Sequence, residues 1–183
     1  ALSFAAGCVQ PVANIAYLFG GRNADDTLSD VLYAIDLASG EIESFAPIYS
    51  PSPRMHAALS CGPDGVSVVG GIGVDGELLN DGWIFGFEDE SWNHLSIGPS
   101  ARREAVAFDR EGVLVLVGGL GADDVALHEE WSYAGNEGEE TTPGVPGNLA
   151  AAGAALDRKG RKLCLAGGFE TGVVAHAPGL SMW

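Results

Sequence analysis

The sequence predicts an all-β fold of four consecutive units, each a four-stranded antiparallel sheet of about 49 residues. Two observations support this fold. Gly-Gly doublets recur at intervals of 50, 48 and 49 residues, and an aromatic residue follows three of them at a constant distance. The 27 Gly residues and the short apolar runs add many turns between short strands, as expected for this class.

The doublets define the second strand of each unit. They are Gly20-Gly21, Gly70-Gly71, Gly118-Gly119 and Gly167-Gly168, and they close the runs IAYLFGG, VSVVGG, VLVLVGG and LCLAGG. These runs are rich in β-branched and aromatic residues, as buried strands are. A Gly pair suits a strand end where the backbone needs a positive φ or close approach.

The remaining strands keep phase with the doublets. First strands are predicted at FAAGCV, MHAALSC, EAVAF and AAAGAAL, and turn residues separate three of them from the second strands. Third strands are predicted at VLYAID, GWIFGF and EEWSYA, which place Tyr33, Trp83 and Trp131 twelve residues after the second Gly. Outer fourth strands are predicted around Phe45 and around Trp92 with Leu95.

A single four-stranded meander buries only one face, whereas successive sheets stacked around an axis bury both. The doublets, the phased aromatic residues and the lead-in SPRMHAAL together resemble the kelch-repeat family over nearly the whole chain. The resemblance implies a kelch-type β-propeller, with units near 1–50, 51–98, 99–147 and 148–183, the last incomplete. Kelch propellers close with more blades than this, so the resemblance implies part of a larger, five- to seven-bladed ring. Further blades from the same or another chain are expected at its open edges.

Two units depart from the repeat. The third has no outer-strand Trp and carries instead the acidic stretch NEGEETTPGVPG, expected to be an exposed loop or a degenerate outer strand. The fourth ends 15 residues after Gly168. It is expected to stop in its third strand, with Trp183 in the aromatic position, or to hold compressed third and fourth strands.

Charge and cysteine content narrow the expected partners and location. The net charge of −16, with only nine Lys and Arg residues, excludes a phosphate-binding surface for nucleic acid and favours a basic protein partner. The longest apolar stretch, Val113 to Ala122, is too short to span a membrane. Three Cys residues without a CxxC pair indicate neither a disulfide framework nor zinc. We therefore expect buried thiols and a cytoplasmic location.

The sequence contains no catalytic motif, and no cofactor or metal is predicted. The four His residues show no local metal-ligand spacing, and GxSxG and GxxxxGK[ST] are absent. The expected function is a protein-interaction scaffold that uses the loop-rich mouth of the propeller. The alternatives are the propeller portion of an enzyme, resembling galactose oxidase or sugar-acid epimerases, and a carbohydrate-binding propeller.

Six polar residues are candidates for ligand contact at this mouth. They start first strands or follow the first doublet: Arg22, Asn23, Arg54, His56, Arg102 and Arg103. The resemblance to kelch adaptors implies that Arg54 and Arg102, each 16 residues before a doublet, grip an acidic peptide. The other two units hold Phe4 and Ala151 at that distance. The alternative is that these Arg side chains pair with acidic neighbours.

Overall fold

The computed structural model describes residues 2–10, 12–96, 98–135, 137–141, 150–156, 163–169 and 180–182, and these residues are almost entirely β-strand and turn. Sheet 1 contains β1 (Ala6–Gln10), β2 (Ile15–Phe19), β3 (Leu32–Asp36) and β4 (Ile42–Phe45). Sheet 2 contains β5 (Ala58–Cys61), β6 (Gly65–Val69), β7 (Gly82–Gly86) and β8 (Trp92–His94). Sheet 3 contains β9 (Val106–Arg110), β10 (Val113–Val117), β11 (Glu130–Ala134) and β12 (Glu137–Thr141). Sheet 4 contains β13 (Ala150–Leu156), β14 (Leu163–Phe169) and β15 (Leu180–Met182).

The all-β prediction is confirmed, and three of the four units are four-stranded antiparallel meanders. In the third unit, residues 137–141 of the acidic stretch form the outer strand β12, while residues 136 and 142–147 lie outside the described part. In the fourth unit β15 pairs with β14 as a third strand, and Trp183 lies outside the described residues. One short helical turn, η1 (Ala122–Asp124), precedes β11. No helix of the described residues is long and apolar enough to span a membrane.

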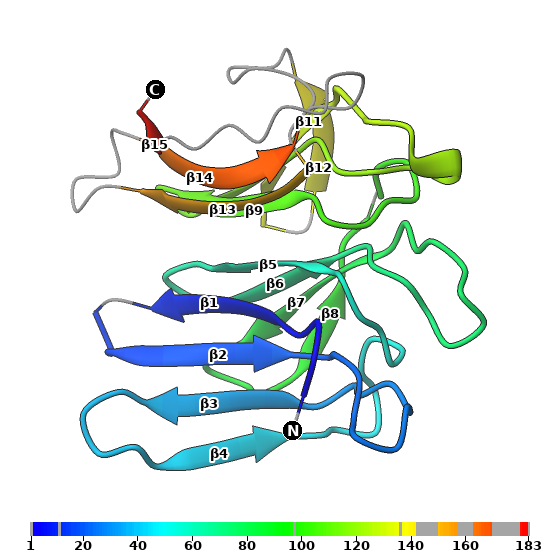
Figure 1. Cartoon of the computed structure of the whole chain (residues 1–183). Helices are drawn as coiled ribbons and strands as arrows, with labels where there is room; N and C mark the ends of the chain where they lie inside the picture. Colours follow the sequence, from blue (N-terminus) through cyan, green and yellow to red (C-terminus); the bar gives the residue numbers. More distant parts are fainter. Residues whose placement is uncertain are drawn as a thin grey trace.

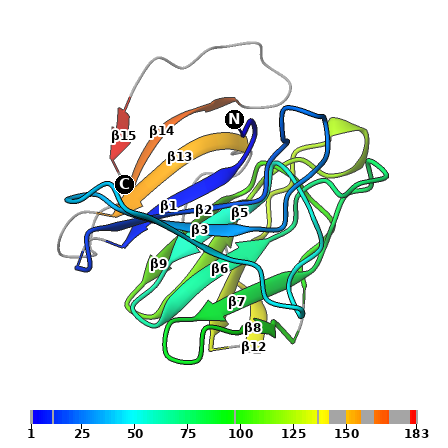
Figure 2. The ribbon, with the colours of Figure 1, turned by 90° about the horizontal axis from the view of Figure 1, so that it is seen from below.

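The sheets follow one another through their first strands. β1 contacts β5, β5 contacts β9, and β9 contacts β13. Figure 1 shows the result, with sheet 1 at the bottom, sheet 4 at the top and sheets 2 and 3 between them. Figure 2 shows the sheets from below, where they partly overlap one another.

Two apolar clusters fill the spaces between successive sheets. Between sheets 1 and 2 the buried side chains are Tyr17, Phe19, Leu32, Ala34, Leu59, Val66, Val68, Trp83, Phe85 and Trp92. Between sheets 2 and 3 they are Ala58, Val69, Leu95, Leu114, Leu116 and Tyr133. Each cluster removes large apolar side chains from water, which is the main force that holds one sheet on the next.

The first three doublets have the predicted left-handed backbone, whereas Gly167-Gly168 lies within strand β14. Gly70 has a φ of +62° and Gly71 a φ of +109°. A Cβ on Gly70 would lie 2.6 Å from the carbonyl oxygen of Arg102, in the lead-in to sheet 3. A Cβ on Gly71 would lie 2.8 Å from the carbonyl oxygen of Met55, in its own unit. The missing side chain of the first Gly thus lets the backbone of the following unit approach. The missing side chain of the second Gly lets the segment before the unit's own first strand approach.

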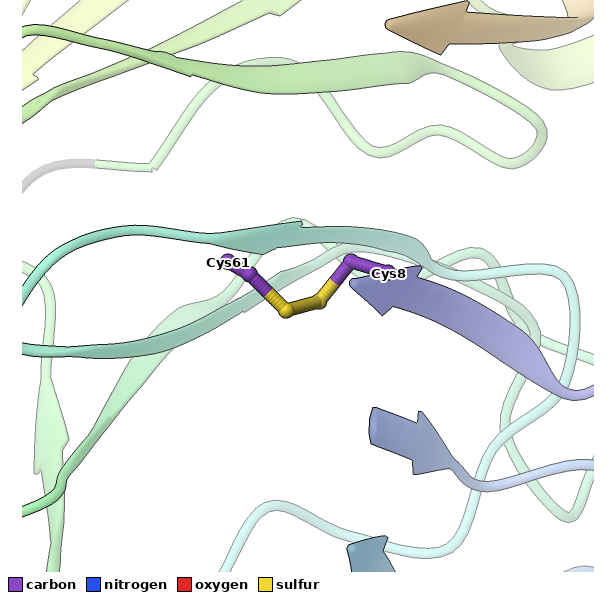
Figure 3. The surroundings of a disulfide bond; sticks show 2 residues. All are labelled: Cys8 and Cys61. Carbon is purple, nitrogen blue, oxygen red and sulfur yellow. A yellow bond between two sulfur atoms is a disulfide. The ribbon is translucent and has the colours of Figure 1, made fainter. Parts of the chain in front are cut away.

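The prediction of free cysteines was wrong for two of the three. Cys8 in β1 and Cys61 in β5 form a disulfide that joins sheets 1 and 2, with a Cα–Cα distance of 5.6 Å (Figure 3). The two residues are 53 positions apart and share no motif, so only the packing of β1 against β5 brings them together. Cys164 lies in β14.

Candidate functional site

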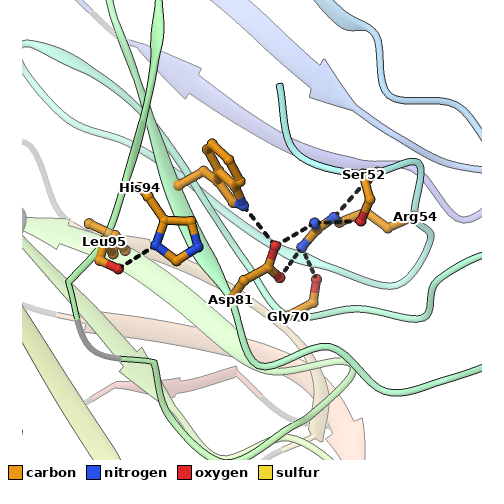
Figure 4. A network of polar contacts seen from close by, with 7 residues as sticks. Ser52, Arg54, Gly70, Asp81, His94 and Leu95 are labelled. Carbon is orange, nitrogen blue, oxygen red and sulfur yellow. Dashed lines mark hydrogen bonds and ion pairs between the residues drawn. The ribbon is translucent and has the colours of Figure 1, made fainter. Parts of the chain in front are cut away.

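Arg54 is a buried structural residue of sheet 2. Its side chain is fully buried, and its two terminal nitrogens donate to Asp81 at 2.6 and 2.8 Å (Figure 4). It also donates to the carbonyl of Gly70 at 3.1 Å and to Ser52, through Nε to the carbonyl at 2.9 Å and through Nη2 to the hydroxyl at 3.0 Å. The indole of Trp83 donates to the same Asp81 carboxylate at 2.7 Å. Desolvation opposes ionisation of Asp81, yet the hydrogen bonds and charge of Arg54 hold the pKa of this carboxyl below its usual value.

Arg102 repeats this arrangement in sheet 3. It is fully buried, forms an ion pair with Glu129, and donates to the carbonyl of Gly118 at 2.8 Å. Trp131 donates to Glu129 at 3.3 Å, and Ser100 donates to it at 2.8 Å. Desolvation raises the pKa of Glu129, but the Ser100 and Arg102 hydrogen bonds outweigh it and lower this pKa overall.

We call these residues the Arg–acid–Trp sets: Arg54, Asp81 and Trp83 in sheet 2, and Arg102, Glu129 and Trp131 in sheet 3. Both Arg side chains are enclosed, so we assign them to the fold and remove them from the candidate ligand contacts. Each of the two Arg side chains pairs with an acidic residue, which is the alternative given in the sequence analysis. The corresponding positions of sheet 1 hold Leu2, Val31 and Tyr33, so all three members are replaced together.

The phased Trp residues belong to the core. Trp83 is 9% exposed, and its ring contacts Tyr49 at 5.5 Å and His94 at 4.7 Å between centroids. Trp131 packs against the cluster between sheets 2 and 3. Trp83 is therefore too enclosed for a sugar ring to stack on it, and Trp131 is partly buried.

Three corresponding residues lie just before the first strands of sheets 1, 2 and 3. Phe4, His56 and Glu104 each lie two residues before the first strand of their sheet, with φ values of +58°, +56° and +57°. Their backbones are linked in sequence, since His56 N–H donates to the Phe4 carbonyl at 3.1 Å and Glu104 N–H to the His56 carbonyl at 2.9 Å. Non-Gly residues with positive φ are uncommon, so three at one repeated position mark a shared structural role. We call them the mouth row.

The side chains of the mouth row also touch one another. The rings of Phe4 and His56 stack with centroids 4.6 Å apart, and His56 Nδ1 lies 3.2 Å from a carboxylate oxygen of Glu104. Desolvation lowers the pKa of His56, and the charge of Glu104 only partly offsets it. His56 is thus held toward its neutral form, in which one ring nitrogen donates and the other accepts.

Two of the predicted Arg residues flank the mouth row. The guanidinium of Arg22 lies 5.6 Å from the centre of the Phe4 ring, and Arg103 donates to Glu104 at 2.6 Å and to Asp124 at 2.7 Å. Desolvation lowers the pKa of Arg103, but its acidic partners raise it overall. Of the six candidates, the structure therefore brings together Arg22, His56 and Arg103.

Asn23 lies beside this group in a surface loop. Its side chain donates to the Thr27 hydroxyl at 3.0 Å and thereby closes the loop at 22–28. The loops at 72–78 and 120–126 occupy the same position in sheets 2 and 3, each bridged to the segment before its first strand. All three extend from the same end of the sheets, on the right in Figure 1. We call this surface the loop face: the mouth row, Arg22, Arg103 and these three loops.

The loop face is acidic and partly apolar. Phe4, Val74 and Val125 expose 52%, 65% and 59% of their surface. Six acidic residues lie in the three loops: Asp25, Asp26, Asp75, Glu77, Asp123 and Asp124. Among the residues that the structure describes, no three His, Cys, Asp or Glu side chains are arranged to hold a metal ion.

Sequence reasoning missed Phe4 and Glu104. Counting back from the doublets aligned Phe4 with Arg54, but the distance from the start of the first strand to the first Gly is 14 residues in sheet 1 and 12 in sheets 2 and 3. The longer first hairpin shifts the alignment by two, which aligns Phe4 with His56. The comparisons with known proteins give no further guide, because no protein-family model and no curated protein matches the chain.

Proposed function

We propose that the chain is a segment of a kelch-type β-propeller. Three features support this architecture: the Gly-Gly doublets, the four-stranded meanders and the serial contact of first strands. The Arg–acid–Trp sets add a repeated polar interaction at the same place in two sheets. Four-stranded sheets stacked through their inner strands are the arrangement that defines a propeller.

We propose that this segment acts as a protein-interaction scaffold through the loop face. The observation that carries the proposal is the mouth row, where equivalent residues of three successive sheets meet beside three surface loops. Loops on a rigid scaffold are the usual place for recognition, and exposed apolar side chains among them favour contact with a protein.

The partner that fits the loop face is a basic segment with apolar side chains. The six loop carboxylates provide negative charge, whereas Arg103 is already paired with Glu104 and Asp124. Arg22 is also engaged, with the Phe4 ring and at 3.7 Å from Asp26. The charge of the loop face and the net charge of −16 therefore both attract Lys and Arg side chains.

Affinity capture with matched variants tests this proposal. The native protein, a loop-face variant carrying Val74→Lys and Val125→Lys, and a control carrying Val12→Lys are compared at low and high salt. Val12 is 92% exposed in the turn between β1 and β2, at the opposite end of sheet 1. The expected result is a protein that the native chain and the control retain, that the loop-face variant loses, and that salt weakens. Equal retention by all three proteins would contradict the proposal.

We also propose that the chain folds in an oxidising compartment. The expectation of a cytoplasmic location depended on free thiols, and the Cys8–Cys61 disulfide removes that basis. Structural disulfides persist in extracytoplasmic compartments and are rare in the reducing cytosol.

A further inference from the structure

His56 is the middle residue of the mouth row, and an Arg residue flanks the row at each end. Arg22 lies 3.7 Å from Asp26, a carboxylate in the loop of sheet 1. Arg103 donates to Asp124 at 2.7 Å, a carboxylate in the loop of sheet 3. Both Arg charges act on the imidazole and oppose its protonation. The ring of His56 is therefore coupled electrostatically to the groups that set the charge of two of the three loops.

Glu104 connects the imidazole directly to one of these Arg residues. Its Oε1 atom lies 3.2 Å from Nδ1 of His56 and also accepts from Nη1 of Arg103 at 2.6 Å. The other terminal nitrogen of Arg103 donates to Asp124. The side chains of His56, Arg103 and Glu104 are 23%, 20% and 17% exposed, and that of Asp124 is 76% exposed. A continuous series of contacts thus leads from a partly buried imidazole to a carboxylate at the surface.

The backbone groups the same residues together. In the described part of the chain, nine non-Gly residues have a positive φ. Five of them belong to the mouth row and the loop of sheet 3: Phe4, His56, Glu104, Asp123 and Asp124. Such conformations cost free energy, persist only where surrounding contacts hold them, and concentrate at binding and switching sites. The contacts of this series therefore also help to hold the backbone of the loop.

The imidazole is neutral at pH 7.5 and takes up a proton from solvent in mildly acidic solution. Desolvation lowers the pKa of His56 below its ordinary value, and the charge of Glu104 only partly offsets it. The charges of Arg103 and Arg22 lower this pKa further. Once protonated, the ring attracts Glu104, whose Oε1 it shares with Arg103, and repels both Arg side chains. Both effects favour closer pairing of the two Arg residues with their loop carboxylates.

We propose that His56 is a proton-operated control of the loop face: uptake of a proton by its imidazole weakens binding of the basic partner. The new positive charge makes the face less attractive to Lys and Arg side chains. The loop carboxylates that pair more closely with Arg22 and Arg103 also offer less free negative charge. This inference rests on the loop-face function proposed above, to which it adds a dependence on pH.

An NMR titration of the protein alone tests the control without a partner. The ring resonances of His56 and the backbone amide of Asp124 are followed from pH 7.5 to 5.0. The amide is expected to shift with the same midpoint as His56, and His56→Gln is expected to lose this step because a carboxamide does not titrate. His128→Gln is the matched control and is expected to keep the step, since His128 is exposed and follows the loop at 120–126. An amide that shows no step at the His56 midpoint, or keeps it in His56→Gln, would overturn the proposal.

Binding of a capped Lys-Leu-Lys-Leu-Lys peptide, measured by calorimetry at pH 7.5 and 5.0, tests the effect on affinity. A unit charge about 6 Å from an ammonium group in water changes affinity about three-fold. We therefore expect acidification to weaken binding to the native protein and to His128→Gln about three-fold more than binding to His56→Gln. An equal effect of pH on all three proteins would overturn the proposal.

These outcomes distinguish the control by His56 from the loop-face function itself. If the peptide does not bind the native protein at pH 7.5, the proposed basic partner is wrong, and the control of its binding falls with it. If the peptide binds but the amide of Asp124 does not follow His56, only the control by His56 is wrong.

Discussion

Replacement of Arg54 tests whether the Arg–acid–Trp set of sheet 2 acts as one unit. In Arg54→Leu the cavity keeps an apolar side chain, as at the equivalent position Leu2 of sheet 1. The change removes five hydrogen bonds: two to Asp81, one to the Gly70 carbonyl and two to Ser52. The Asp81 carboxylate then keeps the indole N–H of Trp83 as its remaining partner among the contacts described.

The magnitude follows from the burial of the two partners. Removal of one member of a buried ion pair costs about 3–5 kcal/mol, because the other charge stays desolvated. The Arg54 side chain is 0% exposed but that of Asp81 is 25% exposed, so water partly solvates the remaining charge. We expect a loss near the lower limit, about 3 kcal/mol of unfolding free energy. For a domain of this size that corresponds to a melting temperature lower by about 6–12 °C.

Urea denaturation measures this loss, and sheet 1 supplies the control. The triple variant Arg54→Leu, Asp81→Val and Trp83→Tyr copies Leu2, Val31 and Tyr33 of sheet 1. Because it leaves no uncompensated charge, we expect its stability to return to within about 1 kcal/mol of the parent. A single variant as stable as the parent would refute the argument. So would a triple variant no more stable than the single one.

Four further predictions concern separate features. Gly70→Ala is expected to unfold the protein, or to lower its unfolding free energy by well above the ~1 kcal/mol expected for Gly76→Ala. Both residues have positive φ, but only a Cβ on Gly70 would meet a backbone carbonyl, and thermal melts compare the two variants. Tyr133→Phe is expected to raise stability by about 1 kcal/mol in urea titrations, because the buried Tyr133 hydroxyl has no hydrogen-bond partner among the described residues. His56 is expected to titrate below 6.5 by NMR, since burial lowers its pKa. Its contribution to stability is then fully present above pH 6.5 and is lost as the pH falls through the folded pKa, so His56→Gln flattens this part of the pH profile. Reduction of the disulfide between sheets 1 and 2, which closes a separation of 53 residues, is expected to lower the unfolding free energy by about 4 kcal/mol, measured in urea with and without reductant.

The strands were predictable because the repeat shows each position several times. The doublets located the second strands, and the positive φ values of the first three confirm the conformation expected of a Gly pair. The aromatic residue twelve positions after each doublet identified the third strands, since Tyr33 and Trp83 occupy the same register in β3 and β7. The sequence alone did not reveal why Trp recurs at this position in sheets 2 and 3. In both sheets its indole N–H donates to a carboxylate two residues earlier.

The candidate site was less predictable, because it depends on contacts between units. Arg54 and Arg102 look like surface cations in the sequence, but their acidic partners lie 27 residues away and enclose them. The disulfide likewise joins Cys8 to Cys61 across a sheet boundary, which no local spacing shows. The mouth row was hidden by a hairpin two residues longer in sheet 1, which a count from the doublets could not detect.

The differences of sheet 1 share one physical origin. Arg54 and Arg102 each join two sheets. The backbone of each Arg hydrogen-bonds to the preceding sheet, and its side chain hydrogen-bonds within the sheet that follows it. The anchor thus fixes the segment that makes the junction. In sheet 1 the segment 2–4 is held to its own sheet by the bridge between Ser3 and Arg22, and Leu2 supplies no polar anchor. The segment 2–4 is therefore held by its own sheet and by the hydrogen bond from His56 N–H to the Phe4 carbonyl, whereas the segments before β5 and β9 also carry a buried Arg anchor.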